Sequence, residues 1–294
     1  MQKDNYITIS TKDFSELDLL GRVIPAVEKL HIRSATKDAR EILRQPRLAI
    51  VGSRKVSNYG QAVTKKLSYD LAKAGITIVS GLALGVDSLG HRGAVEAGGQ
   101  TIAILPCGIG TIYPRSHVGI ARQILDSNPL SALISEYEGD ATPGRHHFLA
   151  RNRIIAGMSD AVLITEAAIR SGSLSTANHA LELGIPVMAV PGPIDSPTSQ
   201  GTNNLIKSGA HLVSSAQDIL AIMDIQPAKA TLRTYQPDND IEDNIINLIS
   251  SDIRTSNEII KKSDFTPEQI HQSLTMLEIK GIIRSNDYCT WHLL

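Results

Sequence analysis

Short, continuous apolar runs alternate with helix-like segments through most of the chain. The runs lie at residues 48–51, 76–81, 101–106, 132–137, 161–167 and 187–192, with a shorter one at 211–213. Apolar runs without polar alternation are typical of strands that helices cover on both faces. Strands and helices that alternate through short links predict a doubly wound parallel sheet of the α/β class.

The segment after the first run shows how the helices are predicted. Ser57 can cap a helix in which Val63, Leu67 and Leu71 recur at four-residue spacing, and Gly75 ends that helix. Serine, aspartate and glycine mark the starts and ends of further helices between the later runs. We therefore expect each link between strands to contain a helix.

The remaining segments divide the chain into four parts. We expect residues 1–45 to form an N-terminal helical extension that docks on the main domain. We expect residues 46–225 to form the main sheet domain. Residues 226–240 are polar and contain two prolines, which is typical of a linker. Residues 241–294 form a small separate domain.

This last domain shows three amphipathic helices followed by a hairpin. The apolar positions that share a helix face are Ile241, Ile245 and Leu248 in the first helix and Ile270, Leu274 and Leu277 in the third. Thr255 or Ser256 can cap the second helix, and Asn286 with Asp287 forms the hairpin turn. The pattern predicts a winged-helix domain. Its third helix carries two acids against one lysine, so a protein-binding or accessory role competes with duplex binding.

Glycine-rich and polar signatures follow the ends of the predicted strands. They lie at residues 52–54, 80–87, 107–115, 165–173 and 191–195. Because ligands bind at the carboxyl ends of the strands in such sheets, these signatures should converge on one rim.

Two of these signatures are candidate phosphate sites. Gly52 and Ser53 precede a helix whose free amides favour an anion, and Arg54 can add a charge-assisted contact to phosphate. The alternative for this motif is a glycine that the turn requires and an arginine that faces solvent. Ser171, Gly172 and Ser173 form a second candidate, for which ordinary helix capping is the alternative. Tyr113, Pro114 and Arg115 follow a glycine-rich turn and are either a loop cover or a further phosphate contact.

Residues 145–157, RHHFLARNRIIAG, form a local run of cations. The run contains Arg145, Arg151 and Arg153, and no acid lies between Ala141 and Ser159. Arginines neutralise phosphates, and the ring of Phe148 offers bases a stacking face. This combination favours a groove for single-stranded nucleic acid, with a solvated basic helix start as the alternative.

Composition restricts where such a ligand could bind. The formal net charge is −1, so an anionic partner needs a local patch. Two distant cysteines argue against a disulfide framework or a zinc site and fit a reducing cytosol. No signal peptide and no apolar run of membrane-spanning length is recognised, so we expect a soluble cytoplasmic protein that does not insert into membranes and needs no metal or cofactor.

An enzyme is the main rival hypothesis. Asp87 and His91 lie four residues apart and could serve a hydrolase, but no nucleophile or metal ligand accompanies them. We favour an arrangement in which Asp87 caps a helix and His91 packs nearby. His146 and His147 lack a third metal ligand.

Five motifs occur together in a recognisable order. They are LAIVGSRKVSNYG, SGLALGVDSLGH, FLARNRIIAGMSDAVLITEA, SGSLSTANHALELG and AVPG followed by SQGTNNLIKSGA. From about Arg47 to Met223 the chain therefore resembles the DNA-processing protein A (DprA/Smf) family. The resemblance implies an extended Rossmann-like domain that binds single-stranded DNA and dimerises. It also implies a role in loading the RecA recombinase during natural transformation, and many members carry a C-terminal winged helix.

The resemblance also implies roles for individual residues. Arg54 matches the DNA-contacting arginine of the family, Arg145 a basic groove residue, and Phe148 a base-contacting aromatic. Arg151, Asn152 and Arg153 match the RNR triplet. The family usually has proline where Leu149 stands, and no catalytic residue is implied.

We therefore predict a homodimeric, non-enzymatic protein that binds single-stranded DNA. The predicted contacts are Gly52, Ser53, Arg54, Arg115, Arg145, Phe148, Arg151, Asn152, Arg153, Ser171, Gly172 and Ser173. The alternatives are a phosphoribohydrolase-like nucleotide hydrolase, with Asp87 or Glu166 as acid/base, and a duplex-binding regulator that acts through the winged helix.

Overall fold

The structure of the chain is a computed structural model that describes residues 6–225, 237, 239–251, 253–285 and 290–293. It divides into two compact units, residues 1–227 and residues 228–294. Most of the predicted linker, residues 226–240, lies outside the described residues.

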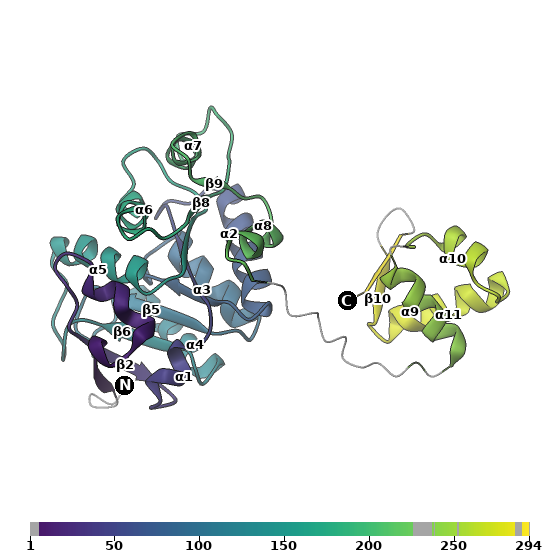
Figure 1. The fold of residues 1–294 in the computed structure, drawn as a ribbon, viewed down its shortest axis with the longest axis horizontal. Coiled ribbons are helices and arrows are strands. Elements are labelled where there is room, and N and C mark those ends of the chain that lie inside the picture. Colours follow the sequence, from purple (N-terminus) through teal and green to yellow (C-terminus); the bar gives the residue numbers. More distant parts are fainter. Residues whose placement is uncertain (1–5, 226–236, 238, 252, 286–289, 294) are drawn as a thin grey trace. The chain divides into compact units, whose positions relative to one another are not determined.

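The larger unit is built on one nine-stranded sheet (Figure 1). The strands are β1 Ile7–Ser10, β2 Lys29–Ser34, β3 Arg47–Val51, β4 Thr77–Ser80, β5 Thr101–Leu105, β6 Ala132–Ser135, β7 Ala161–Ile164, β8 Val187–Ala189 and β9 His211–Leu212. Their order across the sheet is β1-β2-β6-β5-β4-β3-β7-β8-β9. Neighbours from β6 to β9 pair in parallel, whereas β2 pairs antiparallel with both β1 and β6. The sheet is therefore mixed but mostly parallel.

Helices cover both faces of this sheet. They are α1 Ala39–Leu43, α2 Asn58–Lys73, α3 Val86–Glu96, α4 Val118–Ser127, α5 Arg145–Gly157, α6 Ser173–Glu182, α7 Gln200–Lys207 and α8 Ala216–Ile222. In β3, Leu48 and Ile50 pack in one core cluster with α2, α3 and α8, while Ala49 and Val51 pack in another with α5 and α6. Alternate residues of one apolar strand thus face opposite helical layers, as the unbroken apolar runs predict.

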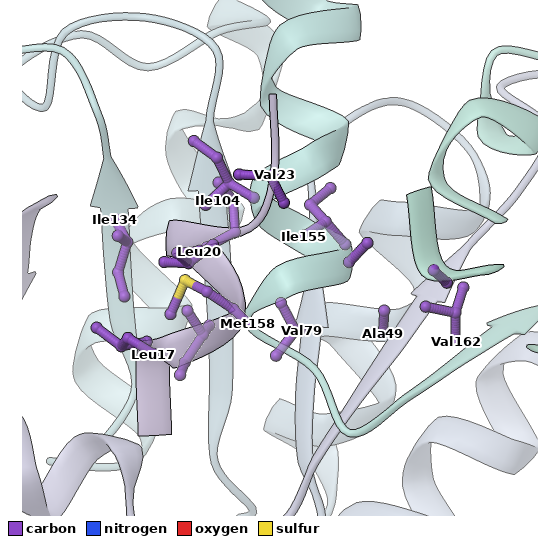
Figure 2. Packing of buried hydrophobic residues seen from close by; sticks show 14 of the residues in the cluster. Leu17, Leu20, Val23, Ala49, Val79, Ile104, Ile134, Ile155, Met158 and Val162 are labelled. Carbon is purple, nitrogen blue, oxygen red and sulfur yellow. The ribbon is translucent and has the colours of Figure 1, made fainter. Parts of the chain in front are cut away.

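The N-terminal segment differs from the predicted helical extension. It contributes β1 and β2 to the edge of the sheet and two short 3₁₀ helices, η1 Thr11–Asp13 and η2 Ser15–Gly21. Figure 2 shows Leu17 and Leu20 of η2 packed with Ile155 and Met158, at and beyond the end of α5. The helical prediction for this segment is wrong because its apolar residues belong to several short elements. The backbone groups at the edge of β6 would be unpaired without β2, and this pairing makes the segment a strand.

The smaller unit has its own core. Its elements are α9 Asp240–Ser250, α10 Ser256–Lys262, α11 Pro267–Ile279, and a hairpin of β10 Ile283–Ser285 with β11 Trp291–Leu293. The predicted cap is present, because the Thr255 side chain accepts a hydrogen bond from the backbone N–H of Glu258. The predicted core positions Ile245, Ile270 and Leu274 are buried. The predicted turn at 286–287 lies outside the described residues.

Among the described residues, no helix combines the length and the apolar character that a membrane crossing requires.

Candidate nucleic-acid interface

The chain reverses its direction across the sheet between β3 and β7. From β3 it proceeds to β4, β5 and β6 on one side, and from β7 to β8 and β9 on the other. The carboxyl ends of β3 and β7 therefore flank a topological switch point, where sheets of this kind bind ligands. A cavity of about 500 Å³ opens there.

Nine of the twelve predicted DNA contacts line this cavity. They are Gly52, Ser53, Arg54, Phe148, Arg151, Asn152, Ser171, Gly172 and Ser173. The convergence of the strand-end signatures on one rim is thereby confirmed for three separate segments. Arg115, Arg145 and Arg153 are not among the lining residues.

The segment after β3 is held tightly against the end of β7. The backbone N–H of Ser53 donates to the carbonyl oxygen of Glu166 over 2.7 Å. A Cβ atom added to Gly52 would lie 2.6 Å from that same oxygen, so glycine is required by the close approach of the two segments. The guanidinium group of Arg54 then emerges exposed at the cavity mouth, beside exposed Lys55.

An aromatic and cationic cluster forms at this mouth. The Arg54 guanidinium lies 5.3 Å from the centroid of the Phe148 ring, a cation–π geometry. The ring of Tyr113 meets Phe148 edge-on, with 5.3 Å between the centroids. Tyr113 is 44% exposed. The sequence indicated a cover or a phosphate contact for its loop and missed that Tyr113 extends the aromatic surface of Phe148.

Arg151 is buried beneath the cluster at 4% exposure. Its Nη1 donates to the carbonyl oxygens of Gly81 and Ile104, each over 2.6 Å, and so ties α5 to the ends of β4 and β5. Burial lowers the pKa of the guanidinium to about 10, so it remains protonated at neutral pH. A side chain at Gly81 would collide with this group. Arg151 therefore contributes a fixed charge to the cavity floor.

Asp87 lies on the same cavity floor. Its Oδ2 accepts hydrogen bonds from the backbone N–H groups of Gly81 (3.1 Å) and Ala83 (3.4 Å). Burial raises the pKa of this carboxyl, and the charge of Arg151 opposes that effect. The predicted helix cap is wrong, because Gly85 occupies the cap position of α3 and the carboxylate instead orders the loop before the helix.

His91 packs as expected and does not act with Asp87 in any hydrogen bond of the described residues. Its Nδ1 lies 2.7 Å from the Thr101 hydroxyl, in the interior of the unit. Burial, together with the charges of His117 and Arg151, lowers the pKa of the ring to about 3. The ring is therefore neutral at physiological pH.

The three arginines outside the cavity have different environments. Arg153 is 3% exposed, and its Nη2 donates to both carboxylate oxygens of Glu136 over 2.8 and 2.9 Å. This ion pair occupies a side chain that was expected to reach the DNA backbone, and burial withholds it from a solvent-exposed phosphate. Arg145, the first residue of α5, and Arg115 are exposed.

The second candidate phosphate site lies where α6 begins. The hydroxyl groups of Ser171 and Ser173 are 2.7 Å apart, and Gly172 is the cap residue without a side-chain cap. The amide nitrogen of Asn152 donates to the Gly172 carbonyl oxygen and to the Ser175 hydroxyl. Asn152 thus fixes the start of α6 against α5, which holds the two walls of the cavity together.

Glu166, the other acid of the rival hydrolase, is committed to structure. Its Oε2 accepts from the backbone N–H of Ser57 over 2.9 Å, and its Oε1 accepts from the Thr198 hydroxyl. It does not line the cavity. Among the described residues, no three His, Cys, Asp or Glu side chains gather as the ligands of a metal ion would.

Comparison with known proteins agrees with this arrangement. Residues 8–224 match the family described as DNA recombination-mediator protein A. The chain belongs to this DprA/Smf family. Residues 226–286 match the DprA winged helix domain, and the described part of the smaller unit has the corresponding helices and hairpin.

Curated relatives share substantial identity with the chain. Protein Smf of Escherichia coli is 47% identical over 173 residues, which cover 59% of this chain and 46% of the relative. DprA of Streptococcus pneumoniae is 41% identical over 181 residues, 62% of this chain and 63% of the relative. A putative DNA processing protein DprA of Mycobacterium tuberculosis is 33% identical over 248 residues, which cover 81% of this chain and 62% of the relative. The chain therefore spans less than two thirds of the length of these relatives.

Two solved structures share the fold. DprA of Streptococcus pneumoniae superposes with a TM-score of 0.66 at 36% identity, covering 74% of this chain and 75% of that one. DNA processing protein A of Helicobacter pylori superposes with a TM-score of 0.65 at 31% identity, covering 77% of this chain and 100% of that one. That protein is described for its unique single-stranded DNA binding mode.

Proposed function

We propose that this chain binds single-stranded DNA along the cavity mouth at the switch point of the sheet. The observation that carries the proposal is the cluster of Arg54, Phe148 and Tyr113. A cation next to two partly exposed rings is what a single strand requires, since the cation pairs with phosphate and the rings stack on bases. The DNA-binding description of the Helicobacter pylori relative supports the same conclusion.

The other contacts have graded roles in this proposal. Arg54 and Lys55 neutralise phosphates at the mouth, and exposed Arg145 and Arg115 extend the path of the strand. The amides and hydroxyls of 171–173 and the hydroxyl of Ser53 offer hydrogen bonds to phosphate oxygens, whereas the amide of Ser53 is bonded to the carbonyl oxygen of Glu166. Arg151 and Asn152 hold the walls in place, and Arg153 stabilises α5 through Glu136.

The wider activity is also a proposal. We infer from membership of the family that the chain acts without catalysis, as a homodimer in the cytoplasm, and helps to load RecA on single-stranded DNA in recombination or transformation. The rate at which RecA assembles on oligo-dT, with and without the chain, tests the loading role. Sedimentation tests the dimer.

The binding experiment compares labelled oligo-dT with a matched duplex by fluorescence anisotropy. Arg54→Ala and Phe148→Ala should weaken binding to oligo-dT. Arg44→Ala is the matched control, because Arg44 is also exposed but precedes β3, whereas Arg54 follows it. The proposal fails if the duplex is preferred, or if Arg54→Ala binds no worse than Arg44→Ala. Turnover of a mononucleotide that Asp87→Ala abolishes would support the hydrolase instead.

A further inference from the structure

The loop after β4, residues 81–84, contains a residue in a conformation that its side chain disfavours. Leu82 has a φ of 56°, in the left-handed region that residues with a side chain rarely adopt. The leucine side chain is fully buried and packs with Leu105 and Ile109 in one core cluster. A buried leucine with this strained backbone persists only where the surrounding structure fixes it.

Three side chains from different elements hold this loop. Asp87 of α3 accepts hydrogen bonds from two backbone N–H groups of the loop, and Arg151 of α5 donates to one of its carbonyl oxygens. The third is His117, at the end of the 3₁₀ helix η3 Arg115–His117. Its Nδ1 lies 2.8 Å from the carbonyl oxygen of Leu82, and both residues are buried. Of the three side chains, His117 is thus the one that bonds to the strained residue itself.

This hydrogen bond determines where the His117 ring carries a proton. A carbonyl oxygen can only accept, so Nδ1 must be protonated and donate to it. Both the neutral ring and the charged ring can carry this proton. The contact therefore requires a donor at one position of the side chain and does not require a charge.

His117 also joins two sides of the cavity mouth. Its backbone N–H donates to the carbonyl oxygen of Pro114 over 2.9 Å and closes the turn that follows Tyr113. The loop that its side chain anchors carries Leu84. Leu84 and Tyr113 line a small cavity of about 80 Å³ together with Phe148. His117 thus connects the Tyr113 turn to the loop after β4.

We propose that His117 is a positioning residue for single-stranded DNA, which holds the loop after β4 in its binding conformation without touching the strand. This inference rests on the proposed function. His117 is only 7% exposed, whereas Arg54 and Tyr113 at the mouth are exposed. Without the Nδ1 donor, the carbonyl oxygen of Leu82 loses its partner and the loop relaxes toward conformations that leucine prefers. Only the chains that keep the native loop then bind DNA, so the affinity falls with their fraction.

The first test examines the ring of His117 in the full parent chain and needs no altered loop. In NMR spectra of the chain with isotope-labelled histidine, His117 should carry a proton on Nδ1 that exchanges slowly with solvent. His117→Asn identifies the signal by its loss. A ring without a proton on Nδ1, or one whose proton exchanges as fast as that of exposed His211, overturns the inference even where a variant does not fold.

A matched pair of variants then separates the donor from the volume of the ring. Asparagine and leucine have the same shape, but only asparagine has an N–H donor, and its Nδ2 is bonded to Cγ as Nδ1 is in histidine. We expect His117→Leu to bind oligo-dT roughly 5- to 100-fold more weakly, and His117→Asn to stay within about twofold of the parent chain, because an unpaired buried carbonyl is costly. Equal affinities of the two variants overturn the inference.

Hydrogen exchange of the free chain distinguishes positioning from a general loss of stability. In His117→Leu, the amides of residues 81–84 should exchange faster than in the parent chain, while those of β3 and β7 keep their rates. Uniformly faster exchange through the larger unit would overturn the positioning role. His179→Leu is the control, because His179 lies on α6 and does not line the cavity.

The outcomes separate this inference from the proposed function. If Arg54→Ala weakens binding to oligo-dT and His117→Leu does not, the positioning role fails and single-strand binding stands. If neither variant binds less tightly than His179→Leu, the proposed function itself fails.

Discussion

Two regions of the chain are candidates for contact with nucleic acid, the cavity mouth of the larger unit and the third helix of the smaller one, and they differ in chemistry. At the mouth, Arg54 and Phe148 present an exposed cation on an aromatic face. On α11, Lys280 donates to the carboxylate of Glu242 over 2.7 Å, and the exposed apolar side chains are Met276 and Ile279. The exposed cation thus lies at the cavity mouth, whereas the exposed surface of α11 is partly apolar.

The largest expected effect concerns the stability of the two units in acid. His91 is neutral when folded, with a pKa lowered from 6.5 to about 3, so the unfolded state takes up a proton more readily. The stabilisation is fully present above pH 6.5 and is lost as the pH falls toward 3, with a total on the order of 5 kcal/mol. Only the larger unit contains His91.

Circular dichroism and tryptophan fluorescence together resolve this difference. The single tryptophan of the chain, Trp291, lies in the smaller unit and reports on it alone. We expect acid to unfold the larger unit, with a weaker pH dependence in His91→Asn, which keeps a polar atom near Thr101. Exposed His211, changed in the same way, is the control. An identical pH dependence in parent and His91→Asn chains would show that the ring titrates normally.

The next effect is on stacking at the cavity mouth. Phe148→Ala should cost about 1–3 kcal/mol of binding free energy to oligo-dT, since it removes the base-stacking face. Phe148→Tyr keeps the ring and should bind nearly as the parent does. Titrations by anisotropy measure both, and equal losses for the two variants would refute a stacking role.

Tyr113 should contribute less than Phe148. Tyr113 contacts the Phe148 ring edge-on and remains 44% exposed. Tyr113→Ala therefore removes a packing contact of Phe148 and part of the aromatic surface on which a base can stack. We expect a loss of about 1 kcal/mol, at the lower end of the stacking range. A Tyr113→Phe chain should show no loss, and a loss there would indicate that the hydroxyl group, not the ring, makes the contact.

A smaller change is expected in the salt dependence. Each phosphate contact to a single strand adds about 0.7 to the slope of log affinity against log salt concentration. Arg54→Ala should lower this slope by about that amount, and Arg44→Ala should leave it unchanged. If Arg54→Ala weakens binding with the slope unaltered, Arg54 acts through Phe148 and not through phosphate.

The smallest effect is expected on α11. Gln272→Ala, on the exposed surface of this helix, should change the affinity for duplex DNA less than about twofold. A loss of tenfold or more would instead make the smaller unit a duplex-binding module.

Much of the fold follows from local pattern. The apolar runs, the Ser57 and Thr255 caps and the core positions of α11 agree with the structure because spacing and capping are local properties. The N-terminal segment does not follow, since β1 and β2 become strands only by pairing with β6. Short segments of this kind take their structure from the partner that tertiary folding brings to them.

The candidate site divides in the same way. By itself the sequence determined which residue types occur at strand ends, and hence that Arg54, Phe148 and the 171–173 turn would share one rim. The sequence could not show which of its four candidate arginines are exposed and which are buried. These four are Arg54, Arg145, Arg151 and Arg153. Only the tertiary structure exposes Arg54 and Arg145, places Arg151 in the cavity floor and pairs Arg153 with Glu136. Burial and ion pairing depend on residues far apart in sequence, and these decide which charges remain available to a ligand.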